Sequence, residues 1–165
     1  MSMQNINFIA NNFPLLMCVL ATIFALLIPA KFNQRFFSCM LFFVIGLGGI
    51  WDFAQHNPYL QQIVPHPINW EQNSLEIPFA MANLALGVSG IISTFTNWFY
   101  RASVVLMASI WFLGCAAFQI DQMITANNFH LNDGTIILTN LLVSIILIIL
   151  LIINYQKTDK DVIYY

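Results

Sequence analysis

The feature that most constrains the fold is the stretch from Gly134 to Tyr155, which is dense in Ile and Leu and contains no charged residue. A helix of about 20 apolar residues is long enough to cross the hydrocarbon core of a bilayer. Four further apolar stretches precede it, and the predicted spans are residues 13–30, 36–53, 77–98, 102–124 and 134–155. The sequence therefore predicts an all-α integral membrane bundle of about five transmembrane helices.

Composition supports this class and excludes others. The chain has 165 residues, of which 59% are hydrophobic and 7% are charged, and its mean hydropathy is +0.77. These values lie far outside the range of soluble domains, so we expect one membrane domain over residues 1–165, surrounded by the lipid bilayer. Five Lys and Arg residues are too few for a protein that binds phosphate backbones, so no nucleic-acid partner is expected.

The basic residues predict the orientation of the spans. Lys31 and Arg35 follow the first span, Arg101 follows the third, and Lys157 and Lys160 follow the fifth. With five spans, all five residues fall on one side of the membrane, and basic residues in short loops are retained in the cytoplasm. We therefore expect the N-terminus outside and the C-terminus in the cytoplasm.

Polar residues gather at the outer ends of the second, third and fourth spans, away from the basic residues. Ionisable groups at a membrane span are costly and usually face a partner or a wet cavity. Small residues share helix faces with them, including Gly87 and Gly90 in the third span and Gly114 and Ala117 in the fourth, and such residues let helices approach closely. We expect an outer pocket between these three helices, and its candidate ligand-binding residues are Asp52, His56, Glu76, Asn83, Gln119 and Asp121.

Each candidate also has a purely structural interpretation. Asp52 and His56 share a helix face, but they can equally form an exposed pair at the water interface. Asp121 can equally mark the solvated end of the fourth span. Asn83 lies about two turns inside the third span, so its amide needs a partner on another helix, and joining two helices would suffice to explain it.

Metal binding and catalysis are two further hypotheses for the same group of residues. Asp52, His56, Glu76 and Asp121 offer oxygen and nitrogen ligands, but their spacing is not specific for a metal site. His56 oriented by Asp52 could act as a base, yet no nucleophile motif accompanies the pair. The metal and the cofactor therefore stay unassigned, and an enzyme is the less favoured hypothesis.

Three stretches resemble a family of small bacterial multi-pass membrane proteins of unknown function. They are GLGGIWDFAQH (residues 46–56), INWEQNSLEIPFAMANLALGVSGII (residues 68–92) and WFLGCAAFQIDQMITANNF (residues 111–129), about half of the chain. The resemblance implies a bacterial cytoplasmic membrane, and by motif it points to His56, Glu76, Ala82, Asn83, Leu84 and Gly87. Phe118 and Gln119 stand where the family has a Gly-His pair, which weakens any metal or acid-base role inferred from the family.

Three functions remain in view. The first is a polar outer pocket that binds a small ligand, a lipid headgroup or an ion. The second is an accessory or assembly subunit, in which Gly and Ala faces meet a second copy or a partner membrane protein. The third is a membrane-embedded enzyme that acts on a lipid-like substrate.

The predicted orientation can be tested by labelling. A cysteine introduced at Gln61 should react with a membrane-impermeant thiol reagent added to intact cells, because we expect the loop after the second span to lie outside. A cysteine introduced at Gln156 should not react until the membrane is opened. The reverse pattern would overturn the orientation.

Overall fold

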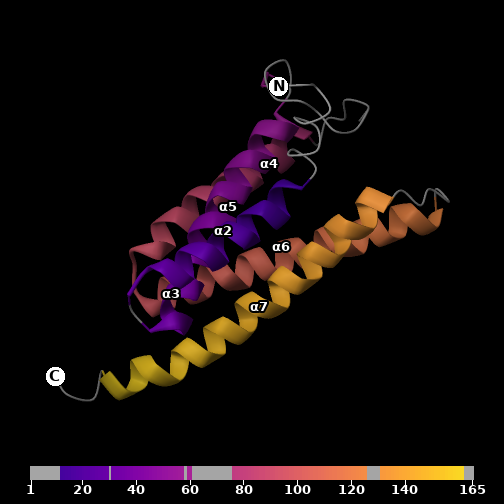
Figure 1. The fold of residues 1–165 in the computed structure, drawn as a ribbon. Helices are drawn as coiled ribbons and strands as arrows, with labels where there is room; N and C mark the ends of the chain where they lie inside the picture. Colours follow the sequence, from indigo (N-terminus) through magenta and orange to yellow (C-terminus); the bar gives the residue numbers. More distant parts are fainter. Residues whose placement is uncertain (1–11, 30, 58, 61–75, 126–130, 162–165) are drawn as a thin grey trace.

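A computed structural model describes residues 12–29, 31–57, 59–60, 76–125 and 131–161. Its elements are α2 (Phe13–Leu27), α3 (Phe32–Cys39), the π-helix η1 (Met40–Leu47), α4 (Gly48–His56), α5 (Glu76–Thr94), α6 (Trp98–Thr125) and α7 (Leu131–Asp161). Every regular element in the described residues is a helix, so the predicted all-α class is confirmed (Figure 1). Most of the connection predicted between the second and third spans lies outside the described residues.

Four described segments are long and apolar enough to cross a membrane: Phe32–His56, Glu76–Thr94, Trp98–Thr125 and Thr135–Tyr155. They correspond to the second to fifth predicted spans, and the bundle is compatible with a membrane protein. The first predicted span is a shorter apolar helix, since the 15 residues of α2 extend only about 22 Å against a hydrocarbon core of about 30 Å. Pro29 explains its early end, because proline disfavours helical backbone at the preceding residue, and Ile28 is extended with ψ 129°.

The second span begins earlier than predicted and contains a π-helical segment. It runs without a break from α3 through η1 to α4, and the Gly48 N–H bonds to the Phe43 carbonyl five residues back. A π-helical turn is wider than an α-helical turn and is often found at functional sites. The sequence pattern did not predict this segment, which packs against α2 and α5.

A short turn joins α5 to α6. It explains why the observed end of the third span and the observed start of the fourth differ from the predicted residues. Asn97 Oδ1 accepts a hydrogen bond of 3.1 Å from the Tyr100 N–H, so Asn97 caps a helix that begins at Trp98 rather than residue 102. The Phe95 N–H bonds to the Ile92 carbonyl. The third span consequently ends at Thr94 instead of residue 98.

Glycines bring the second span and α5 into direct backbone contact. A Cβ added to Gly87 would lie 2.8 Å from the Ile50 nitrogen and 2.9 Å from the Gly46 oxygen, and one added to Gly90 would lie 2.7 Å from the Gly46 nitrogen. A Cβ on Gly49 would likewise meet Gly87 at 2.8 Å. No side chain fits at these positions, so the expectation that small residues let these two helices approach closely is confirmed.

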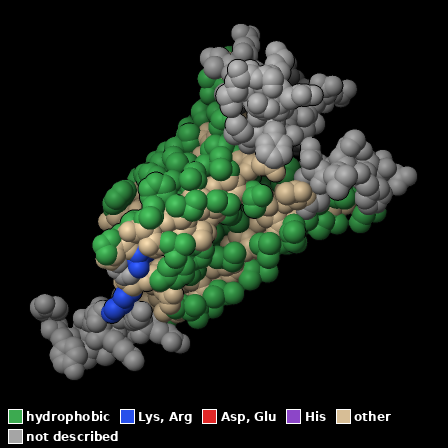
Figure 2. All heavy atoms as spheres, in the orientation of Figure 1, with side chains coloured by type: hydrophobic (Ala, Val, Ile, Leu, Met, Phe, Trp, Pro, Cys, Tyr) green, Lys and Arg blue, Asp and Glu red, His purple; other side chains and the backbone are tan. Residues whose placement is uncertain are grey.

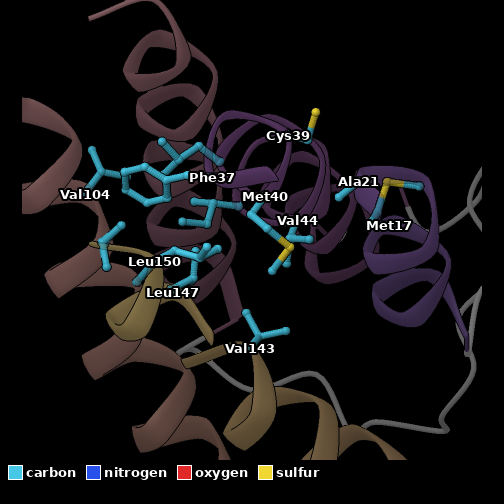
Figure 3. Packing of buried hydrophobic residues seen from close by; sticks show 14 of the residues in the cluster. Met17, Ala21, Phe37, Cys39, Met40, Val44, Val104, Val143, Leu147 and Leu150 are labelled. Carbon is cyan, nitrogen blue, oxygen red and sulfur yellow. The ribbon is translucent and has the colours of Figure 1, made fainter. Parts of the chain in front are cut away.

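The hydrophobic core lies between the second span, α6 and α7, and α2 covers it from the other side. Figure 3 shows Phe37 of α3 pointing towards Val104 of α6, with Leu147 and Leu150 of α7 beside them. Ala21 of α2 is fully buried in the same cluster. α6 packs along α7, while α5 packs along η1 and α4 (Figure 1).

The outer surface of the bundle is mainly apolar. Large hydrophobic side chains such as Leu27, Ile110 and Ile152 are exposed at 72%, 72% and 57%, as expected for helices whose solvent is lipid. On the face drawn in Figure 2, the described Lys and Arg atoms gather at the end of the bundle near α3. Lys31, Arg35 and Arg101 lie at this end, where α3 and α6 begin.

The close contact of Gly46 and Gly49 with Gly87 and Gly90, called the glycine contact below, can be tested with a matched pair of substitutions. Gly87→Ala should lower the free energy of unfolding by about 1–3 kcal/mol, because its methyl group would overlap backbone atoms. Gly114→Ala should be neutral or slightly stabilising, because nothing lies within 4 Å of its Cβ position and alanine favours a helix. Denaturation in mixed micelles measures both, and equal effects would contradict the close contact.

Candidate functional site

The region where α4, α5 and α6 meet contains a chain of ring contacts. The His56 ring of α4 lies edge-on to the Phe79 ring of α5, with centroids 4.8 Å apart. Phe79 in turn lies 5.0 Å from the Trp111 ring of α6, and Trp111 donates a hydrogen bond to Asn83 of α5. These four side chains from three helices are called the aromatic-amide cluster below.

Asn83 is the buried polar member of this cluster. Its side chain is 2% exposed, and its Oδ1 accepts a hydrogen bond of 3.0 Å from Trp111 Nε1. A buried amide in an apolar span needs such a partner, so the expectation that Asn83 bonds to another helix is confirmed. Its Nδ2 has no hydrogen-bond partner among the described residues, which leaves the donor half of the amide unsatisfied.

The glycine contact determines which residues face Asn83. A Cβ at Gly49 would lie 2.7 Å from the Asn83 main-chain oxygen, so α4 lies directly against α5 at this level. Asp52 and His56 follow Gly49 by three and seven residues, which places them on the same helix face. Both therefore lie along the α5 side of α4.

The contact between Asp52 and His56 runs through the main chain. His56 Nδ1 lies 2.8 Å from the Asp52 carbonyl oxygen. A carbonyl only accepts hydrogen bonds, so this geometry assigns the proton of a neutral ring to Nδ1 and leaves Nε2 as the acceptor nitrogen. The two residues share a face as predicted, and this bond fixes the orientation of the imidazole.

Several further polar atoms of α4, α5 and α6 are buried. Glu76, the first residue of α5, is 6% exposed, and its Oε2 has no hydrogen-bond partner in the described part of the chain. Among the described residues the same holds for Trp51 Nε1, Gln55 Nε2 and Gln119 Oε1. Buried polar groups are usually paired, and each exception calls for a water, an ion or a ligand.

Asp121 is not brought to the aromatic-amide cluster. Its side chain is exposed, whereas Gln119 is half-buried. Asp121 lies ten residues beyond Trp111, about 15 Å further along α6, and Figure 1 shows α6 and α7 diverging from α4 and α5 towards this end. Asp52, His56, Glu76 and Asn83 thus lie along the contact between α4 and α5, and Asp121 lies apart from it.

The expectation that Gly114 and Ala117 pack against neighbouring helices is wrong. Both are exposed, and nothing lies within 4 Å of a Cβ placed on Gly114. The buried residues of α6 include Ala108 and Ala116. At about 100° per residue, Gly114 and Ala117 fall on the opposite side of the helix.

Comparison with known proteins identifies a family. A sequence profile of a family of unknown function, DUF6790, matches residues 11–160. The chain belongs to this family. The match spans α2 to α6 and nearly all of α7, so the resemblance seen in the sequence motifs is confirmed. No curated protein and no solved structure matches the chain.

A metal site requires several His, Cys, Asp or Glu side chains close together in this DUF6790 chain. Within them, no group of three His, Cys, Asp or Glu side chains is close enough to hold a metal ion. Asp52, His56 and Glu76 therefore do not form such a group.

Phe79 and Trp111 were not among the residues predicted from the sequence. Trp111 lies in the middle of an apolar helix, where an indole N–H needs an acceptor, and Asn83 lies in the middle of the preceding span. Because each side chain needs a partner inside the membrane, the sequence offered a signal for the hydrogen bond between Trp111 and Asn83. Phe79 carries no such signal, because nothing in the sequence distinguishes it from a lipid-facing phenylalanine.

The hydrogen bond between Trp111 and Asn83 can be tested with a matched pair of substitutions. Trp111→Phe should lower the free energy of unfolding by about 1–2 kcal/mol, since it removes an interhelical bond and leaves the amide of Asn83 unsatisfied. Trp98→Phe removes an indole N–H that has no described hydrogen-bond partner. It should therefore lower the free energy of unfolding by less than Trp111→Phe does. Denaturation of both variants in detergent provides the comparison, and an equal loss would contradict a stabilising bond.

Proposed function

We propose that this DUF6790 chain is a multi-pass protein of a bacterial cytoplasmic membrane that binds a small polar ligand, a lipid headgroup or an ion. The binding site is the outer part of α4 and α5, around Asp52, His56, Glu76 and Asn83, with α6 supplying Trp111. The observation that carries the proposal is the burial of the Glu76 carboxylate and the Asn83 amide, each with a polar atom that lacks a described partner.

The chemistry of these atoms favours a ligand with both donors and acceptors. Glu76 Oε2 accepts hydrogen bonds, whereas Asn83 Nδ2 and Gln55 Nε2 donate them. Glu76 and Asn83 are two helical turns apart, about 10 Å along α5. A small molecule that carries an ammonium or hydroxyl group and an acceptor group would complement this arrangement.

The charge asymmetry supports an outward-facing site. Lys31, Arg35 and Arg101 lie where α3 and α6 begin, while Asp52 lies in α4 and Glu76 begins α5, towards the other end of these antiparallel helices. Because basic residues are retained in the cytoplasm, the Glu76 end faces outwards.

A second candidate function is that of an accessory or assembly subunit. The exposed face of α6 that contains Gly114 and Ala117 favours it, because small residues on a lipid-facing helix allow another helix to approach closely. The partner would be a second copy of the chain or another membrane protein.

Native mass spectrometry of the gently extracted protein tests the proposal. The wild-type protein should carry a bound small mass, and Glu76→Gln should weaken its binding by roughly tenfold to a hundredfold, because a hydrogen bond to a charged group is lost. Asp121→Asn removes the same charge from an exposed position and should leave binding unchanged.

The outcomes distinguish the two candidate functions. An equal effect of both substitutions, or a wild-type protein without any bound small mass, would contradict the ligand site. A homo-oligomer or a co-purifying protein in place of a bound small mass would favour the assembly role.

A further inference from the structure

A second region of the molecule, away from the aromatic-amide cluster, contains an open cleft. Its volume is about 830 Å³, within the range of ligand sites in proteins. Side chains from α2, α3, η1, α6 and α7, from the end of α5 and from the turn between α5 and α6 line it. The cleft lies at the end of the bundle where the Lys and Arg atoms gather in Figure 2.

Arg101 is held rigidly at the wall of this cleft. Its Nε donates a hydrogen bond of 3.0 Å to the Ser93 carbonyl, and its Nη2 donates one of 2.6 Å to the Thr94 carbonyl. The guanidinium carbon also lies 6.0 Å from the centroid of the Phe37 ring of α3. These contacts fix the position of the charge, while Nη1 makes no hydrogen bond with a described residue.

Arg35 brings a second positive charge to the same cleft. It lies on α3, two residues before Phe37, whose ring contacts the Arg101 guanidinium. The Arg35 side chain is half-buried. Among the described residues that line the cleft, none is acidic, and Asn97 and Gln34 add neutral polar groups. Two guanidinium groups from different helices attract an anion, and arginine matches the oxygens of a phosphate group well.

The remaining wall of the cleft is apolar. Phe24 and Ile28 of the α2 end are exposed at 43% and 44%, and Phe42 and Phe43 of η1 line the same space. A free phosphate ion would leave these side chains uncovered, whereas an acyl chain would cover them. The occupant that fits is therefore amphipathic, with an anionic head and a hydrocarbon tail.

We propose that this cleft binds an anionic phospholipid, with its phosphate between Arg35 and Arg101 and an acyl chain along Phe24 and Phe43. Basic clefts between membrane helices on the cytoplasmic side are suited to anionic headgroups. This site is separate from the one around Asn83 and does not depend on it.

Lipid titration of the purified full-length chain in a neutral detergent, followed by native mass spectrometry, tests the proposal. Phosphatidylglycerol should bind at least about fivefold more tightly than phosphatidylcholine, and Arg35→Gln should weaken phosphatidylglycerol binding by about fivefold. Lys31→Gln is the matched control, because Lys31 is exposed at the same end but does not line the cleft. This control should change binding less than twofold.

Three outcomes would overturn the proposal. The first is equal binding of the two lipids to the wild-type protein, a result that needs no variant. The second is an equal loss in Arg35→Gln and Lys31→Gln, with melting temperatures showing that both variants are folded. The third is displacement of the lipid by inorganic phosphate at comparable concentration, which would show that the cleft recognises the anion alone.

Discussion

The backbone contact between the second span and α5 is the constraint on which the candidate site depends. Gly46 and Gly49 meet Gly87 and Gly90 so closely that a single methyl group would overlap main-chain atoms. In a lipid environment, where hydrophobicity does not drive helices together, this closeness supplies packing energy. It also turns the face that carries Asp52 and His56 towards α5.

The two ends of the bundle use polar residues in different ways. Towards the start of α5, Asn83 and Glu76 are buried with atoms that lack a partner among the described residues, which is a costly arrangement in an apolar medium. Towards its end, Arg101 satisfies the final carbonyl groups of α5 and at the same time lines an open cleft. A buried polar group suits selective binding of a small molecule, whereas a half-buried cation beside an apolar wall suits a lipid.

Helix α6 has two distinct sides. Its inward side supplies Val105 and Ala108 to the core, and its outward side carries small residues that nothing in the described chain covers. The same residue type therefore has opposite roles in α5 and α6. Gly87 is buried against backbone, while nothing in the described residues lies within 4 Å of a Cβ placed on Gly114.

The helical class, the approximate spans and the separation of charge could be predicted from the sequence, because each follows from local composition and the thickness of a bilayer. It also identified Asn83 as a residue that needs a partner. The folded arrangement was needed to show that the partner is Trp111, that Asp121 lies apart, and that Arg35 and Arg101 share a cleft. These facts depend on the rotation of each helix about its axis, which packing against several neighbours decides together and which hydropathy along one helix does not encode.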